Sequence, residues 1–276
     1  MKAEKIPISV QEAIEQLNVE LNPELGINTE RCITHLENGT GNSWACKGSL
    51  EGYATIKAIL AWFEGRDIVG LKNWAFNTAK LRRSMYQERS TGPYYTSAYL
   101  MPLLSDDQRL VEWFSSFALP FSLTRDTLMG GRTNNLNMDD YHHYNTWLAL
   151  RGDWEPLAER CRAFLAAVPA KQTSYQADHR FHLALAEGDA RGMEVALLEL
   201  VEPTLMWRRQ AEERAYTQYF ICTCAVVYAK IAWRHGYQVT VDSPWVPKEW
   251  LSVAPLPNYE DAFAYMVGLN DTLPVE

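Results

Sequence analysis

The sequence lacks the long apolar runs that membrane insertion or secretion requires. Its richest apolar stretch, Ile221 to Trp233, is interrupted by Lys230 and is shorter than the roughly 20 residues of a membrane-spanning helix. The first ten residues contain Lys2 and Lys5, but no apolar segment follows them, as one does in a signal peptide. We therefore expect a cytoplasmic protein that does not contact membranes.

Cysteine is scarce as well. The five cysteines, Cys32, Cys46, Cys161, Cys222 and Cys224, are odd in number and irregularly spaced. A disulfide framework has an even number at regular spacings, so this pattern favours free thiols in a reducing compartment. Cys222 and Cys224 are two positions apart and would point to different faces of a helix, which argues against a shared metal ion.

Positive charge is the third shortage. The 276 residues include 26 basic and 34 acidic side chains, a net charge of −8. This balance argues against non-specific binding to nucleic acid or anionic lipid and favours a basic protein partner. The acidic excess is uneven, because residues 1–120 carry 12 basic and 14 acidic side chains, whereas residues 121–276 carry 14 and 20.

Apolar side chains, in contrast, are plentiful and recur at steps of three and four almost throughout. This spacing is typical of α-helices and predicts an all-α protein of antiparallel helical hairpins, loosely repeat-like in the C-terminal half, with at most one short extended segment at 237–241. We expect a single helical domain over residues 1–276, with a possible seam near 90–121. The predicted helices span residues 10–21, 29–37, 44–64, 67–89, 106–117, 122–130 and 213–235, besides the later hairpins.

Two similar turns mark the C-terminal half. Gly152-Asp153 and Gly188-Asp189 lie 36 residues apart, and each follows a Leu-Ala-Leu run. In each turn the glycine can adopt the left-handed conformation that ends a helix, and the aspartate can cap the next helix. The spacing is close to that of two-helix repeats, but two imperfect copies favour ordinary helical hairpins over a repeat array.

The densest polar cluster is Asp139-Asp140-Tyr141-His142-His143. On a helix, Asp139 shares a face with His142 and His143, which could form part of a metal site or an acid–base pair. Negative charge is also favourable at a helix N-terminus. We therefore interpret the cluster as a helix start that contacts a partner and keep metal binding or catalysis as the alternative.

Other signatures of catalysis are weak. His179 and His182 lack the spacing of four and the intervening Glu of metalloprotease helices, so we expect one of them to pack between helices and the other to be exposed. Arg82-Arg83 and Arg208-Arg209 are isolated basic pairs, which indicates solvated helix ends. With no phosphate-binding loop and no serine nucleophile elbow in the sequence, we predict a protein that is not an enzyme and holds no cofactor or metal.

The C-terminal part carries a longer pattern: a helix end, an alternating segment bounded by proline, and a short helix start. The pattern reads Ala232-Trp233-Arg234-His235-Gly236, then Tyr237-Gln238-Val239-Thr240-Val241-Asp242-Ser243-Pro244-Trp245-Val246-Pro247, then Trp250-Leu251. Together with Leu183-Ala184-Leu185 and the Gly188-Asp189 turn, it resembles the immunity protein 49 family of bacterial polymorphic toxin systems. The recognisable features cover residues 140–252, within the part of the chain from residue 122 onward.

The resemblance implies an intracellular protein that binds and neutralises a cognate toxin delivered by a competing bacterium. Many such toxins act on nucleic acid and are basic, so an acidic inhibitor would gain fast association with one and could cover its active site stoichiometrically. Because the resemblance supplies no functional residues, we choose candidates by charge and predicted exposure. The candidate partner-binding residues are Asp139, Asp140, Tyr141, His142, Glu187, Asp189, Glu212 and Glu213.

Two other functions remain open from the sequence. The first is an enzymatic immunity protein, a metal-dependent hydrolase that reverses the toxin's damage through the Asp139–His143 cluster. The second is a helical-repeat scaffold that binds a peptide in a groove. The sequence leaves open the chemistry of the toxin, the helical face that binds it and the oligomeric state.

Overall fold

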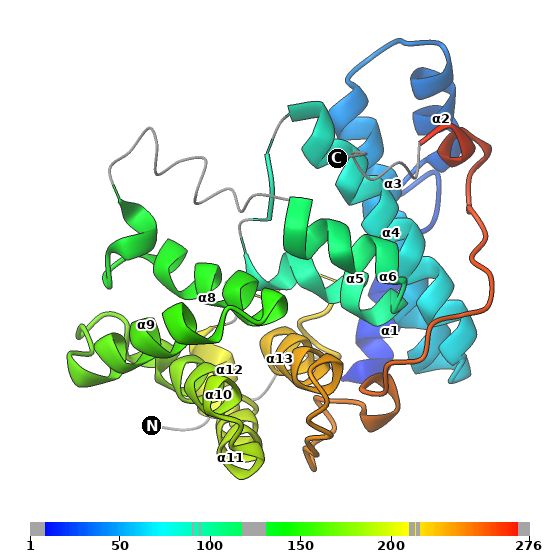
Figure 1. The fold of residues 1–276 in the computed structure, drawn as a ribbon. Helices are drawn as coiled ribbons and strands as arrows, with labels where there is room; N and C mark the ends of the chain where they lie inside the picture. The colour runs from blue at the N-terminus through cyan, green and yellow to red at the C-terminus, as the bar shows by residue number, and fades with distance from the viewer. Residues whose placement is uncertain are drawn as a thin grey trace. The chain divides into compact units, whose positions relative to one another are not determined.

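The computed structural model of the chain is helical throughout its described part (Figure 1). The described residues are 9–89, 91–93, 95–117, 131–209, 213 and 216–269. Every regular element within these ranges is a helix or a helical turn, which confirms the all-α prediction. The helix predicted at 122–130 falls outside the described residues. Within those ranges, no helix combines the length and the apolar character needed to cross a membrane.

The described residues form two compact units. The first, which we call the α3–α4 unit, contains residues 9–89, 101–114 and 254–269. The second, the α8–α13 unit, contains the rest of the described residues from 91 to 253. The single folding domain expected from the sequence stays a prediction.

Apart from α5, which was not predicted, the helices of the α3–α4 unit lie close to the predicted ranges. They are α1 (Val10–Glu20), α2 (Thr29–Glu37), α3 (Ser43–Gly65), α4 (Ile68–Arg89), α5 (Leu100–Ser105) and α6 (Gln108–Glu112), followed by a π-helical turn (Trp113–Phe117) and a 3-10 turn (Ala264–Gly268). The start of α1 shows how neighbouring residues determine where a helix begins. Ser9 Oγ accepts the Glu12 N–H at 3.2 Å, and the Glu12 carboxylate accepts the Ser9 N–H at 2.6 Å, a capping box that satisfies two backbone donors.

A long hairpin of α3 and α4 forms the centre of this unit. The two helices meet at Arg66, a non-glycine residue in the left-handed conformation with φ of 51°. Its guanidinium lies 5.1 Å from the ring centre of Trp62, a cation–π contact that offsets part of the backbone strain. Further along the hairpin, Leu50 and Leu81 pack with Met266 in a cluster whose three members are fully buried.

A buried ion pair connects three segments of the α3–α4 unit. Lys72 Nζ lies 2.8 Å from Asp106 Oδ2, and their side chains are only 6% and 0% exposed. The Lys72 ammonium also donates to the Ala254 carbonyl at 2.5 Å, and the Ala254 N–H donates to Asp106 at 3.2 Å. Asp106 itself has a positive φ of 58°. One carboxylate therefore links α4, the α5–α6 connection and the C-terminal segment.

The helices of the α8–α13 unit form two hairpins and a central helix. They are α8 (Asp139–Arg151), α9 (Trp154–Ala166), α10 (Gln176–Glu187), α11 (Ala190–Leu200), α12 (Pro203–Arg208) and α13 (Thr223–Arg234), with short 3-10 turns at Thr96–Tyr99, Arg132–Asn134, Thr173–Tyr175 and Lys248–Trp250. As predicted, Gly152 and Gly188 end α8 and α10 in the left-handed conformation, with φ of 78° and 73°. Asp189 caps α11 by accepting the Gly192 N–H at 2.9 Å, whereas Asp153 bonds Arg151 instead.

The segment after α13 fills the space beside both glycine turns. A Cβ atom added to Gly188 would lie 3.0 Å from the Tyr237 hydroxyl, and one added to Gly152 would lie 3.4 Å from the His235 ring. His235 Nε2 also donates to the Ala149 carbonyl at 2.9 Å. Both turns therefore need glycine for close approach as well as for their backbone angle.

The predicted helix at 213–235 is shorter in the structure, where α13 begins at Thr223. Two contacts divert the preceding backbone. The Glu213 carboxylate accepts the Thr223 N–H at 3.0 Å, and the Cys222 N–H donates to the Trp245 carbonyl at 2.9 Å. These side-chain and long-range bonds replace helical ones at the N-terminus of α13. The segment 237–241 is irregular and forms no sheet, with Val239 buried in the core.

The buried ion pair leads to a stability prediction. Asp106→Asn removes the carboxylate charge and leaves the Lys72 ammonium buried without it. We expect the free energy of unfolding, measured by urea denaturation, to fall by about 3–5 kcal/mol. Arg109→Ala is the matched control, since it breaks the Arg109–Asp107 pair, whose arginine side chain is 53% exposed. That change should cost less than about 1 kcal/mol, and equal losses for the two variants would contradict the prediction.

Candidate functional site

Two histidines meet at the centre of the α8–α13 unit. His142 on α8 and His179 on α10 are 3% and 0% exposed, and His142 Nδ1 lies 2.8 Å from His179 Nε2. Gln172 Oε1, 3.2 Å from His142 Nε2, can only accept, so His142 Nε2 carries the proton. His142 Nδ1 then accepts from His179 Nε2, and His179 Nδ1 accepts from the Asn145 amide at 3.3 Å. Arg160 Nε fixes that amide by donating to Asn145 Oδ1 at 2.7 Å.

This chain of bonds uses each ring nitrogen once as donor or acceptor, so both imidazoles are neutral. Burial lowers the pKa of His142 to about 2, with the neighbouring His143 adding to the shift. Burial likewise lowers the pKa of His179 far below its ordinary value, helped by His142. The pair therefore cannot exchange protons with solvent near neutral pH, as a general acid or base must.

His182, one turn further along α10, is buried in a different way. Its side chain is 1% exposed, and neither ring nitrogen has a hydrogen-bond partner among the described residues. The rings of Phe181 and Tyr228 lie 5.6 and 4.6 Å from its own. Burial lowers the pKa of His182 to about 3. Our expectation that one of His179 and His182 would be exposed is wrong, because α10 is covered on both of the faces that carry them.

An ion pair beside these histidines joins α10, α12 and α13. Arg209 Nη1 lies 2.6 Å from Asp178 Oδ2, and the Tyr228 hydroxyl donates to Asp178 Oδ1 at 2.6 Å. Arg209 is only 7% exposed. The prediction of a solvated pair therefore holds for Arg208 and is wrong for Arg209, because a carboxylate on another helix compensates for its burial.

Three of the predicted partner-binding residues lie inside the unit. Asp140 is fully buried and accepts from Arg132 Nη2 at 2.6 Å. The Tyr141 hydroxyl donates to the Arg160 carbonyl at 2.7 Å, and His142 belongs to the histidine pair. These side chains cannot touch a partner directly. The physical reason is that α8 is a central helix, and within this run only Asp139 faces solvent.

The other predicted residues are spread over the unit. Glu187 and Asp189 are exposed at the α10–α11 turn, where Glu187 pairs with Arg162 at 2.6 Å. Glu213 is half-buried beside the start of α13, and Glu212 lies outside the described residues. The structure therefore brings together Glu187 and Asp189, while Asp139 stands apart from them at the start of α8.

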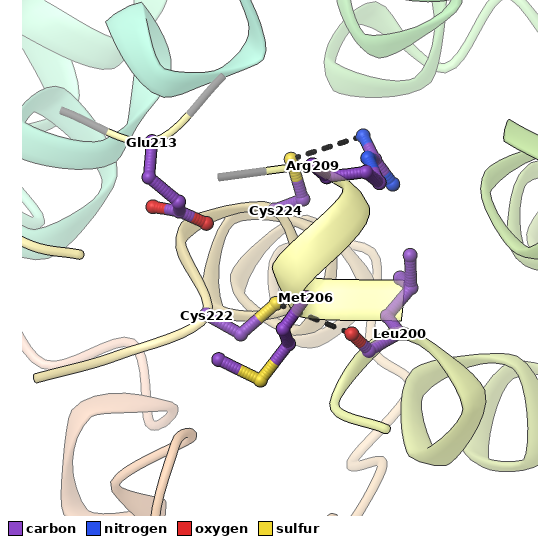
Figure 2. Close-up of a pocket in the computed structure, with 6 residues that line it drawn as sticks. All are labelled: Leu200, Met206, Arg209, Glu213, Cys222 and Cys224. Atoms are coloured by element: carbon purple, nitrogen blue, oxygen red, sulfur yellow. Dashed lines mark hydrogen bonds between the residues drawn. The ribbon is translucent and has the colours of Figure 1, made fainter. Parts of the chain in front are cut away.

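A small cavity lies next to Arg209 (Figure 2). It is lined by Leu200, Met206, Arg209, Glu213, Cys222 and Cys224. Its volume of about 10 Å³ accommodates one water molecule and no substrate. Figure 2 shows the two thiols directed to different partners, Cys222 to the Leu200 carbonyl and Cys224 to Arg209. Burial raises the pKa of Cys222 to about 12, so this thiol is a poor nucleophile.

The described residues also offer no candidate metal centre, since no three of their His, Cys, Asp or Glu side chains come together in a way that could hold an ion. In the Asp139–His143 cluster, His143 Nδ1 lies 3.2 Å from the Thr96 hydroxyl and the ring is buried, whereas Asp139 is exposed. Asp139 and His143 therefore lie in different environments, one exposed and one buried, and they do not form a reactive pair.

The outer face of α11 exposes two large apolar side chains. Val195 and Leu198 are 58% and 44% exposed, although large apolar side chains are usually buried. They lie one turn apart between the exposed Arg191 and Glu202. Sequence reasoning missed this stripe, and its signal was the apolar character of α11 on more sides than a hairpin helix needs to bury.

Comparison with known protein families matches residues 119–250 to the family described as Immunity protein 49. The match covers α8 to α13, where the sequence pattern had suggested the same family, and it confirms that resemblance. Searches of curated proteins and of solved structures found no match to the chain.

The buried histidines predict acid sensitivity. In the unfolded chain a histidine has a pKa near 6.5, whereas burial holds the pKa values of His142, His179 and His182 far lower. Their contribution to stability is therefore complete above about pH 6.5 and is lost as the pH falls below it, because only the unfolded chain then takes up protons. Each should lower the free energy of unfolding by about 1.4 kcal/mol per pH unit, measured by urea denaturation between pH 6.5 and 5.

His182→Phe provides the control for this prediction. It removes one titrating ring without removing a hydrogen bond of that ring, since none is present among the described residues. The slope should become shallower by about 1.4 kcal/mol per pH unit, because the contribution of one titrating ring is lost. An unchanged slope would show that these histidines do not set the pH dependence.

Proposed function

Since residues 119–250 belong to the Immunity protein 49 family, we propose that the protein is an immunity protein that neutralises a cognate toxin domain by covering its active site. The observation that carries the proposal is the combination of this family match with an α8–α13 unit whose central histidines are buried with depressed pKa values and whose cavity beside Arg209 has room for only about one water molecule. Such a unit acts through its surface. In this proposal the complex forms in the cytoplasm, where the toxin would act.

We propose the outer face of α11 and the adjoining α10–α11 turn as the centre of the contact surface. Val195 and Leu198 supply exposed apolar area on a rigid helix, while Glu187, Asp189 and Glu202, together with Arg191, border it with charged side chains. An apolar centre with a polar rim is the usual anatomy of a protein interface. This surface retains two of the candidates chosen from the sequence, Glu187 and Asp189.

The acidic balance of the chain supports a basic toxin, such as a nuclease. Residues 121–276 carry most of the net charge of −8, and Asp139, Glu187 and Asp189 are exposed acidic side chains in this part. Opposite charges on two partners accelerate their encounter by long-range attraction. In this proposal the acidic side chains steer the toxin to the surface, and the apolar stripe holds it there.

Occlusion is also better supported than binding of a peptide in a repeat groove. A groove of that kind would be lined by the first helices of the two hairpins, α8 and α10. Among the described residues, α8 exposes only its two end residues, and α10 exposes only Glu187. The helices with free outer faces are the second ones, α9 and α11, and they favour a convex contact.

Co-expression with the product of the adjacent open reading frame, which in this proposal is the toxin, tests the apolar stripe. Val195→Arg places a charge at the centre of the proposed surface, so we expect at least about tenfold weaker binding by calorimetry and loss of protection from killing. Val19→Arg is the matched control: it is 52% exposed, also on a helix, and lies in the α3–α4 unit. Equal effects of the two changes, or none, would exclude α11 as the contact surface.

The steering role of the acidic side chains has a separate test. The double variant Asp139→Lys/Glu187→Lys should lower the association rate constant by roughly tenfold at low salt and by less at high salt, because screening weakens long-range attraction. Stopped-flow mixing with the purified toxin measures both rates. Glu15→Lys/Glu20→Lys, two exposed changes on α1, carries the same change of net charge. An equal decrease for both double variants would assign the effect to net charge alone.

A further inference from the structure

The C-terminal residues 254–269, which we call the strap, lie against α4 in the α3–α4 unit (orange to red in Figure 1). Residues 254–263 have no regular secondary structure, and many of them are exposed. An irregular segment still needs partners for its backbone groups. In the strap, these partners are side chains of a helix.

Two asparagines one turn apart on α4 bind the strap backbone. Asn73 Oδ1 accepts the Glu260 N–H at 2.8 Å, and its Nδ2 donates to the Glu260 carbonyl at 3.2 Å. Asn77 Nδ2 donates to the same carbonyl at 2.9 Å, and its Oδ1 accepts the Ala262 N–H at 2.7 Å. Asn77 is fully buried. These bonds involve only the backbone of the strap, so any extended segment could make them.

Alternate strap residues then add side-chain selectivity, with the period of two that an extended chain gives. Tyr259, Asp261 and Phe263 all contact the α3–α4 hairpin, whereas Glu260 between them is exposed. The contacts are a stack of Tyr259 on Phe76 with ring centres 4.7 Å apart, a two-pronged ion pair of Asp261 with Lys80 at 2.8 and 2.9 Å, and an aromatic contact of Phe263 with Tyr53 at 6.1 Å.

We propose that this face of α4, formed by Asn73, Phe76, Asn77 and Lys80, is a recognition groove for an extended acidic–aromatic segment of a partner protein. The strap occupies the groove as an intramolecular competitor. The seated strap defines the ligand chemistry: an aromatic side chain, then an acidic one two residues later, then a second aromatic one. The proposal is independent of toxin binding by α11.

Three observations favour a displaceable ligand over an ordinary part of the core. The strap is anchored at two points, by Ala254 at the buried ion pair and by Met266 in the cluster with Leu50 and Leu81. Between these anchors, residues 259–263 are held mainly by polar bonds, which a competing segment can replace one for one. The Lys80 side chain is only 4% exposed, so the groove selects for a negative charge opposite it. Asn is a poor helix former, yet α4 places two of them at adjacent turns where they serve the strap.

A peptide-binding experiment with the full chain tests the groove. The probe is a fluorescent peptide with the sequence of residues 254–264, and the readout is fluorescence anisotropy. The chain variant Tyr259→Ala/Asp261→Lys weakens the internal strap and leaves the groove intact. We expect it to bind the peptide at least about tenfold more tightly than the wild-type chain does, because the internal competitor is weakened.

Two controls make the result specific. Adding Asn77→Ala to the variant, or using a peptide with lysine in place of Asp261, should abolish binding. The thermal unfolding midpoint of each chain shows whether it is folded. Absence of binding to a folded Tyr259→Ala/Asp261→Lys chain, or equal binding of the charge-reversed peptide, overturns the proposal.

Hydrogen exchange of the wild-type chain provides a test without mutation. If the strap detaches on its own, the amides of Glu260 and Ala262 should exchange at least about tenfold faster than the core amides of α4. If they exchange only when α4 itself unfolds, the strap is an inseparable part of the unit and the proposal fails.

Discussion

Hydrogen bonding between uncharged groups is the constraint on which the α8–α13 unit depends. His142 and His179 share one hydrogen bond, and each has a second partner that allows only one tautomer. The chain works only if Gln172 and Asn145 also present the correct atom, and neither could rotate its amide without losing a partner. This requirement fixes the register of α8 against α10. It thereby determines which faces of α9 and α11 remain on the outside.

In the α3–α4 unit, the buried polar groups of α4 include several full charges. Lys72, Lys80, Arg82 and Arg83 of α4 are all at least 96% buried, so the expectation that Arg82 and Arg83 lie at a solvated helix end is wrong. Lys72 meets Asp106, Lys80 meets Asp261, and Arg82 meets Glu51. Such pairs add little net stability compared with apolar packing but penalise any arrangement that separates them. The unit thus specifies its C-terminal segment by charge as well as by shape.

The sequence predicted features that depend on neighbouring residues. The left-handed stops at Gly152 and Gly188 follow from residues a few positions apart, and both are in the structure. Features that depend on distant residues were missed. Nothing near Arg209 reveals that Asp178 will bury it, and the late start of the expected helix at 213–235 depends on Trp245.

In the candidate site, too, features set by neighbouring residues were predicted and features set by distant residues were missed. Acidic residues at a turn, such as Glu187 and Asp189, were recognised as exposed, because turns lie at the surface in most folds. Asp140, Tyr141 and His142 looked equally polar in the sequence. Their burial depends on a central position of α8, and their partners Arg132, Arg160 and Gln172 come from outside that helix. The exposed apolar stripe on α11 could be located only after the packing was known.

The fit of His235 and Tyr237 beside the two glycine turns limits which residues related proteins can have there. The absent side chain of Gly188 leaves room for the hydroxyl of Tyr237, and that of Gly152 leaves room for His235. Both glycines also have a positive φ, which strains any larger residue, so a smaller residue at 235 or 237 would not by itself make room for a side chain at either turn. Gly152 and Gly188 should therefore stay glycine in every relative that keeps these two turns.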